Sequence, residues 1–278
     1  MSLNPLVSVI IPTYNRFSLL REAIQSVLAQ TVRDFELIIA DDGSTDETPT
    51  LATLSGIRYV RIDHTGKPGL VRNHGAETAK GDYLAFLDSD DLWKPGKLAR
   101  QIALFKERPE LKITHTRELW LRNGREVSQS GQRHRRSGMI FKDALKKCTI
   151  GPSTVMLKKS LFMESGGFRD DLEIAEDYEL WLRITAFHKV GYINRPLTVK
   201  RAGFSDQLSE KYGHIEYFRI KALLPLVESK FFPAEKQKLA EEELVKKCLI
   251  YAGGCRKRGK IEEATEYEVI ASKYEDGN

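Results

Sequence analysis

The chain lacks the features of a disulfide-stapled, zinc-binding or membrane-spanning protein. Its three cysteines, Cys148, Cys248 and Cys255, form no C-x-x-C pair. An odd, widely spaced set argues against a disulfide framework and against a zinc site. The longest apolar runs are about six residues, whereas a helix that crosses a bilayer needs about 20. With no segment that reads as a signal peptide, we expect a cytoplasmic protein, compatible with peripheral contact at the inner face of the membrane.

A strong charge of one sign is also missing. Lysine and arginine number 44 against 39 aspartates and glutamates, which gives a net charge of +5. This slight excess is compatible with an anionic ligand or an anionic membrane surface but requires neither, and we expect no nucleic-acid partner. A length of 278 residues allows one large domain, or one domain with an appendage.

The first ninety residues alternate between strand and helix patterns. Apolar, β-branched-rich runs that predict strands cover residues 6–11, 35–40, 57–62 and 83–87. Helical patterns separate them, at residues 19–28 and 69–79. Short buried strands that alternate with helices predict an α/β fold with a Rossmann-like, mostly parallel central sheet flanked by helices.

Polar clusters follow three of these predicted strands. They are residues 12–15 (PTYN), 41–44 (DDGS) and 88–91 (DSDD). In parallel sheets ligands bind beyond the carboxyl ends of the strands, so we expect a site where these clusters meet. Turn formation alone is an alternative for the second cluster, because Asp, Gly and Ser are common turn residues.

The middle of the chain is less regular. We predict a helix at residues 97–106, a strand at 113–121 and a hairpin turn at Asn123-Gly124. A short strand is expected at 153–157 and a helix at 177–187, with Leu180, Trp181 and Ile184 facing inward. Residues 128–138 (SQSGQRHRRSG) are polar and basic. They predict a mobile loop that meets phosphate or acceptor, or alternatively a plain solvated loop.

From about residue 207 the pattern is only helical. Residues 240–251 and 261–274, separated by Gly253-Gly254, predict a helical hairpin with the small-residue rhythm of one tetratricopeptide unit. Because one unit is not an array, we expect a helical cap packed on the main domain, with partner docking as the alternative.

The acidic cluster needs positive charge nearby. Asp88, Asp90 and Asp91 lie within four residues, and carboxylates this close repel one another unless a cation neutralises them. Mg²⁺ and Mn²⁺ prefer such oxygen ligands together with substrate phosphates. On extended backbone Asp88 and Asp90 share a face, which leaves Asp91 to point away or to cap a helix. The alternative is an acidic turn with no metal.

Neither G-x-G-x-x-G nor G-x-x-x-x-G-K-[ST] occurs, which excludes the common dinucleotide and P-loop sites. Five segments instead resemble, in order and spacing, the family-2 glycosyltransferases: VSVIIPTYN (7–15), DDGSTD (41–46), RNHG (72–75), FLDSDD (86–91) and Glu176-Asp177. The resemblance implies the GT-A fold over residues 5–205, and we expect residues 206–278 to form a helical extension that packs on it.

By this resemblance Pro12, Thr13 and Tyr14 border the base and ribose of a UDP- or dTDP-linked donor. Asp42 would accept a hydrogen bond from the uracil or thymine ring, which suits a carboxylate and an imide N–H. Arg72 would contact the nucleotide through its guanidinium. Alternatively, Asp42 only caps a turn and Arg72 is a surface residue.

The resemblance also implies the chemistry. Asp90 would bind Mn²⁺ or Mg²⁺, with Asp88 reaching the ribose or a metal-bound water, and the metal would stabilise the leaving diphosphate. Asp177 would be the general base and Glu176 would orient the site, so that single displacement inverts the anomeric centre. Alternatively, both acids only stabilise a helix N-terminus.

The chain departs from the family in two places. The Q-x-x-R-W motif of processive synthases is missing, which implies single addition, and near residue 201 the family's loop keeps Arg201 but lacks its histidine. Arg201 would then meet the diphosphate.

The implied acceptor is a saccharide or lipid-linked saccharide of a cell-surface polymer. Two other hypotheses are a sugar nucleotidyltransferase, which lacks support because residues 12–16 contain no glycine, and a catalytically silent binding module.

Overall fold

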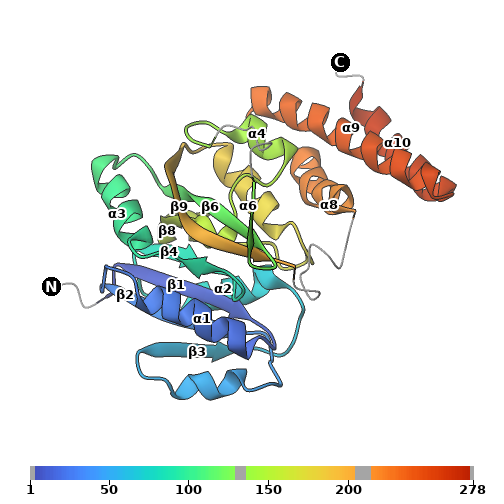
Figure 1. Ribbon diagram of the computed structural model, residues 1–278. Helices are drawn as coiled ribbons and strands as arrows, with labels where there is room; N and C mark the ends of the chain where they lie inside the picture. The colour runs from blue at the N-terminus through green and yellow to red at the C-terminus, as the bar shows by residue number, and fades with distance from the viewer. Residues whose placement is uncertain (1–3, 129–135, 204–213, 276–278) are drawn as a thin grey trace.

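A computed structural model describes residues 4–128, 136–203 and 214–275. The first four strands pair in parallel in the order β3-β2-β1-β4, and helices lie on both of their faces (Figure 1). These strands are β1 (Val7–Thr13), β2 (Phe35–Asp41), β3 (Ile57–Arg61) and β4 (Tyr83–Phe86). The predicted mixed α/β class is confirmed.

Alternating side chains of β1 and β2 enter different cores. Val7, Val9 and Ile11 pack with α1 (Phe17–Leu28) and α3 (Lys97–Glu107). Ile10 packs instead with α2 (Pro68–Thr78) and with α6 (Glu176–Thr185) on the other face. Because successive side chains of a strand point to opposite faces, this alternation buries the sheet on both sides. Because both faces are covered by apolar cores, polar side chains are left to the ends of the strands.

The second half of the sheet has mixed strand directions. β8 (Met156–Lys158) joins β4 and β6 (Ile113–Arg122) by antiparallel pairs, and β6 runs parallel to β9 (Val190–Ala202). Two short strands complete the sheet: β5 (Leu92–Trp93) pairs with β9, and β7 (Arg125–Val127) with β6. The parallel arrangement is therefore confined to the first four strands and the β6–β9 pair.

The strand predicted at residues 153–157 was placed too early. A 3-10 turn occupies Pro152–Thr154 and β8 begins only at Met156. Proline has a fixed φ and no N–H for a sheet ladder, which favours a turn at this point. Two short helices, α4 (Phe141–Lys146) and α5 (Lys159–Glu164), flank this region, and a 3-10 helix follows β2 at Thr48–Thr53.

Three helices at the C-terminal end share a core with α4 and α6. They are α8 (Ile215–Glu228), α9 (Ala234–Lys257) and α10 (Ile261–Glu275), and in Figure 1 the α9–α10 pair lies far from β3. The division into residues 5–205 and 206–278 stays a prediction. No described helix is both long and apolar enough to span a membrane.

The helical hairpin turns later than the sequence pattern predicted. α9 continues through Gly253 and Gly254, and its break falls at Gly259, which has a φ of 76°. The N–H of Lys260 bonds to the carbonyl of Cys255 and the N–H of Gly259 to that of Arg256. This pair of bonds is a Schellman motif, which needs a left-handed residue that glycine provides without strain.

Candidate active site

The three predicted polar clusters meet at one edge of the sheet. The N–H of Asp42 bonds to the carbonyl of Thr13, which joins the ends of β1 and β2. The N–H of Asn15 donates to the Ser44 hydroxyl at 2.9 Å. The Arg16 guanidinium donates to an oxygen of Asp90 at 2.8 Å, across 74 residues of sequence. The carboxyl ends of β1, β2 and β4 therefore form a single polar surface.

The acidic cluster follows β4 as a compact group. Carboxylate oxygens of Asp88, Asp90 and Asp91 all lie within 4.8 Å of one another. Asp91 is 1% exposed and accepts from the Ser153 hydroxyl at 2.6 Å and from the N–H of Arg201 at 3.0 Å. Burial and the neighbouring acids raise the Asp91 pKa to about 8. Asp91 is thus a structural member of the cluster, held between β4 and β9.

Arg72 joins the acidic cluster to α6. Its guanidinium donates at 2.6 Å to Asp88 and at 2.6 Å to Glu176, a residue 104 positions away. A Cβ at Gly75 would lie 2.6 Å from Cγ2 of Ile10, so the glycine of the RNHG segment lets α2 pack directly on β1. This close packing aims Arg72 into the site. A surface position for Arg72 is therefore wrong, since the residue is 5% exposed.

Burial strongly affects the pKa values of Arg72, Asp88 and Glu176. Burial raises the Glu176 pKa to about 7, against the lowering effect of Arg72. Burial also opposes ionisation of Asp88, yet Arg72 and then Lys200 hold the Asp88 pKa below its usual value. In return, Asp88 and Glu176 raise the Arg72 pKa although burial lowers it. The guanidinium is permanently charged and shared between the two acids.

Asp177 is the second residue of α6, after Glu176, and is half-buried. One oxygen accepts from the N–H of Tyr178 at 2.6 Å and the other from the Cys148 thiol at 3.1 Å. Burial, and then the Asp177 charge, raise the Cys148 pKa well above its ordinary value, so this thiol stays protonated and can donate. Trp181 is core, as predicted, and donates to the carbonyl of Ile150.

Asp42 is bound by a neighbouring loop. Its carboxylate accepts from the N–H and the hydroxyl of Thr65 at 2.8 and 2.9 Å, and from the N–H of Gly66 at 2.8 Å. His64 places Nδ1 2.9 Å from the same carboxylate and stacks on Tyr14, with ring centroids 3.8 Å apart. Thr13 is 4% exposed, and its hydroxyl has no hydrogen-bond partner among the described residues.

Arg201 lies near the end of β9 and is already engaged. Its guanidinium donates to Glu22 and to the backbone carbonyl of Asp90. Residues 204–213, which follow it, and residues 129–135 of the basic segment lie outside the described residues. The bonds of Arg201 to Glu22 and to the carbonyl of Asp90 thus hold the acidic turn in place.

Pro12 is buried in β1, one residue before Thr13.

Sequence reasoning missed four residues of this surface: Arg16, His64, Cys148 and Lys200. Lys200 is charged among acids, because Asp91, Glu118 and Asp88 raise its pKa although burial lowers it. Its position directly after the PTYN cluster could have suggested Arg16. The other three lie in segments whose spacing carries no pattern, and only the fold brings them here.

The donor set fits a hard divalent cation. Asp88 and Asp90 supply carboxylate oxygens within reach of one ion, and Arg72 binds only one oxygen of Asp88. Mg²⁺ and Mn²⁺ are commonly held by one or two carboxylates with phosphates completing the shell. The third acid, Asp91, is 1% exposed, and its two oxygens already accept from the Ser153 hydroxyl and the N–H of Arg201. Asp88 and Asp90 thus stay the predicted ligands of such an ion.

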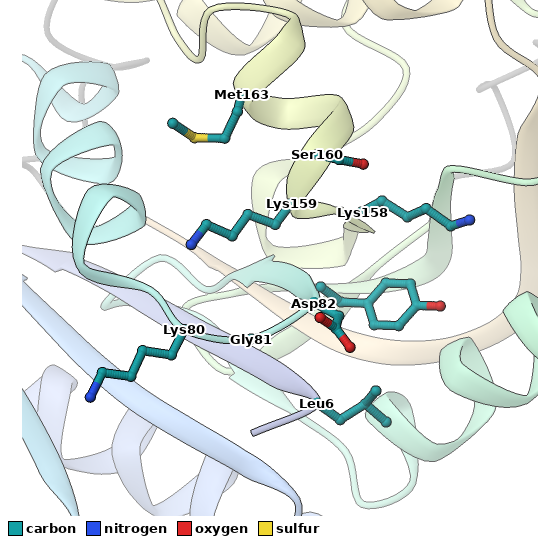
Figure 2. Close-up of a pocket in the computed structure, with 9 residues that line it drawn as sticks. Leu6, Lys80, Gly81, Asp82, Lys158, Lys159, Ser160 and Met163 are labelled. Atoms are coloured by element: carbon teal, nitrogen blue, oxygen red, sulfur yellow. The ribbon is translucent and has the colours of Figure 1, made fainter. Parts of the chain in front are cut away.

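A separate hollow of about 570 Å³ lies at the opposite ends of the same strands. Figure 2 shows three lysines around it, together with Leu6, Asp82 and Met163. They are Lys80, Lys158 and Lys159. The acidic cluster is at the carboxyl end of β4 and this hollow at its amino end, so the two are distinct surfaces.

The fold with an acidic cluster after β4 is that of the GT-A glycosyltransferases. The Glycosyl transferase family 2 profile matches residues 8–166, and the chain belongs to this family. An uncharacterized glycosyltransferase of Rickettsia felis is 37% identical over 199 residues, covering 70% of this chain and 33% of the relative. The chain thus spans about a third of the length of that relative.

Two further proteins are similar over most of their length. The UDP-Glc:alpha-D-GlcNAc-diphosphoundecaprenol beta-1,3-glucosyltransferase WfgD of Escherichia coli is 32% identical, over 68% of this chain and 73% of WfgD. The crystal structure of S. aureus TarS 1-349 in complex with UDP-GlcNAc superposes with a TM-score of 0.67 at 18% identity, covering 98% of this chain and 92% of TarS 1-349. The latter likeness concerns the fold.

Proposed function

We propose that this chain is an inverting, metal-dependent glycosyltransferase that adds single sugars from a UDP- or dTDP-linked donor to an acceptor hydroxyl. The observation that carries the proposal is the linked set of charges at one edge of the sheet. Asp88, Arg72 and Glu176 form a continuous chain of ion pairs that ends beside Asp177. This arrangement supports a cation site at Asp88 and Asp90 and a general base at Asp177 on the same surface.

The donor base and ribose would bind at the ends of β1 and β2. The Thr13 hydroxyl is buried without a partner among the described residues, which leaves it available for a ligand contact. Tyr14 is 39% exposed and offers an aromatic face beside Asp42. The names of WfgD and of the TarS complex, which contain UDP-Glc and UDP-GlcNAc, support a uridine nucleotide.

Asp90 and Asp88 would hold Mn²⁺ or Mg²⁺. When bound, such an ion neutralises the donor phosphates and stabilises the leaving nucleoside diphosphate. Arg72 keeps Asp88 ionised and fixes the orientation of its carboxylate. Arg16 contacts one oxygen of Asp90 at 2.8 Å and fixes the orientation of that carboxylate. Arg201 would meet the diphosphate only by exchanging its contact with Glu22.

Asp177 would remove the proton of the acceptor hydroxyl. Asp177 is half-buried, whereas Glu176 is 5% exposed and held by Arg72. A base on the face of the sugar opposite the leaving diphosphate gives single displacement with inversion. Glu176 would act by positioning Arg72. The alternative, that both acids serve only the helix dipole, leaves the buried Arg72 contact unexplained.

The acceptor would be a saccharide or a lipid-linked saccharide. The name of WfgD, with its diphosphoundecaprenol acceptor, supports this class. Residues 5–205 would carry donor binding and catalysis, and α8–α10 would extend the surface beside α4 and α6. We propose that the enzyme works at the inner face of the cytoplasmic membrane, where such lipids are accessible.

A nucleotide-sugar panel tests the proposal. UDP-, dTDP-, GDP- and CDP-sugars are added with and without Mn²⁺, and thermal stability is measured, because a ligand that binds the folded state raises Tm. We expect a Mn²⁺-dependent rise with a uridine or thymidine donor. Transfer to a saccharyl-diphosphate lipid then gives a product whose anomeric configuration is read by NMR, with inversion expected. Binding without turnover would support a silent module, and no shift with any donor would contradict the proposal.

A further inference from the structure

His64 makes both of the contacts expected of the donor base. Its ring lies on Tyr14 with a centroid distance of 3.8 Å and an interplanar angle of 15°. Its Nδ1 lies 2.9 Å from Oδ2 of Asp42 and 3.0 Å from the backbone carbonyl of Asp42. Both neighbours of Nδ1 are acceptors, so this nitrogen carries the hydrogen. A planar ring that stacks on Tyr14, bonds to the Asp42 carbonyl and lies against the Asp42 carboxylate occupies the place expected for a bound uracil.

The Asp42 carboxylate has no capacity left for a base while His64 is in place. A carboxylate offers about four lone-pair sites. Thr65 fills two through its N–H and hydroxyl and Gly66 fills one through its N–H, while Nδ1 of His64 lies 2.9 Å from Oδ2 and covers the fourth. An imide N–H can reach Asp42 only when one of these donors leaves.

His64 is the donor that can leave at the lowest cost. The bonds from Thr65 and Gly66 include two backbone N–H groups, and a Cβ at Gly43 would lie 2.7 Å from the backbone N of His64. The backbone of the loop is therefore packed against the DDGS turn. The His64 side chain is 47% exposed, and half-exposed side chains change rotamer in picoseconds to nanoseconds.

We propose that His64 occupies the base position of the donor site and that the nucleobase replaces it when the donor binds. The inference rests on the proposed function, since it takes Tyr14 and Asp42 as the base contacts. His64 thereby sets the donor affinity. The exchange favours bases that replace both contacts of the displaced imidazole, by offering a ring face to Tyr14 and an N–H to Asp42. The loop backbone stays in place and only the imidazole moves.

Binding of UDP in the presence of Mn²⁺ measures the competition. Removal of an internal competitor that fills the site about nine-tenths of the time tightens binding about tenfold, because apparent affinity scales with the competent fraction. We expect His64→Ala to bind UDP about 3- to 30-fold more tightly than wild type in calorimetry. His64→Phe keeps the ring but loses the N–H, and is expected between the two.

His188→Ala is the matched control, because His188 follows the end of α6 that is remote from Asp177. It should bind UDP as wild type does. Equal or weaker UDP binding by His64→Ala, with normal thermal stability, would overturn the inference while leaving the proposed function intact. Weaker binding would mean that the imidazole holds the base. Failure of wild type and variants alike to bind UDP, dTDP or GDP would overturn the proposed function and this inference with it.

A donor-independent measurement checks the stacked pair itself. In ¹³C-histidine-labelled protein, the His64 ring signals, assigned by their loss in His64→Ala, should show the ring-current shift of a stacked neighbour. Tyr14→Leu should remove that shift without any nucleotide. Saturating UDP should remove it in wild type. A His64 signal that resembles an exposed histidine before UDP is added would overturn the inference even if UDP binds.

Discussion

The two ends of β4 carry polar groups of opposite kinds. At the carboxyl end, Asp88 and Asp91 are buried or half-buried and are held by Arg72 and Ser153. At the amino end, Lys80 and Lys158 line an open hollow of about 570 Å³ (Figure 2), and neither ammonium group has an ion pair among the described residues. The acidic cluster is held by specific hydrogen bonds and ion pairs, whereas the described residues provide none to the ammonium groups of Lys80 and Lys158. Charge that is buried and paired points to a candidate site better than the size of a cavity does.

The first way to sharpen this comparison is to remove the proposed base. Asp177→Asn keeps the size and polarity of the side chain but cannot take a proton, so we expect transfer to fall about 10²- to 10⁴-fold. Binding of UDP should stay within about threefold because donor contacts lie elsewhere. Steady-state kcat and calorimetric Kd are measured together. Asp171→Asn, which removes an exposed partner of Arg169, is the control, and equal losses in both variants would refute the assignment.

The second test breaks the chain of ion pairs. Arg72→Met leaves Asp88 and Glu176 buried without their cation, and removal of one partner of a buried pair costs about 3–5 kcal/mol. Urea unfolding should show this loss of stability. Adding Glu176→Gln to Arg72→Met should restore part of it, because one unpaired buried charge is then gone. Arg169→Met, at an exposed pair, should cost less than about 1 kcal/mol. A similar cost at both arginines would refute the comparison.

The third test concerns Lys97, a buried amine that makes no ion pair with an acid among the described residues. Lys97 of α3 is 0% exposed, lies 3.9 Å from the Trp93 ring centroid, and has its pKa lowered well below 10.5 by burial. The unfolded state then binds more protons between the lowered pKa and 10.5, so stability rises with pH through that window. Lys97→Met should stabilise the fold by about 1–3 kcal/mol at neutral pH and flatten this rise.

Denaturation at several pH values measures the effect of Lys97→Met. Lys106→Met, on the exposed face of the same helix, should change stability by less than about 0.5 kcal/mol at every pH. Destabilisation by Lys97→Met would show that the contact with Trp93 and the 3.4 Å approach to the carbonyl of Val155 outweigh the cost of burial.

The smallest effect is expected at the hollow. Lys80→Ala with Lys158→Ala removes one exposed and one half-buried charge, neither of which makes an ion pair among the described residues. Stability should change by less than about 0.5 kcal/mol, and transfer to a soluble acceptor by less than about twofold. A larger loss of transfer would place a functional contact at the amino end of the strands and would remove the contrast between the two ends.

The sequence alone determined the first half of the fold and the edge where the site lies. Apolar runs at residues 6–11 and 35–40 predict buried strands from local sequence alone, and parallel strands bring the turns that follow them together. The acidic cluster was therefore predictable down to Asp88, Asp90 and Asp91. In the second half, short strands such as β5 and β8 have two or three residues, too few for a pattern, and their directions stayed unpredicted.

The tertiary structure decided which charges meet. Arg16 reaches Asp90 across 74 residues and Arg72 reaches Glu176 across 104. The same holds for His64, which lies in a loop of unremarkable composition yet stacks on Tyr14 and bonds to Asp42. Strand and helix formation depends on neighbouring residues, whereas the partner of a buried charge depends on the path of the whole chain. Local spacing therefore pointed to the candidate site, and long-range packing decided which of its charged groups meet.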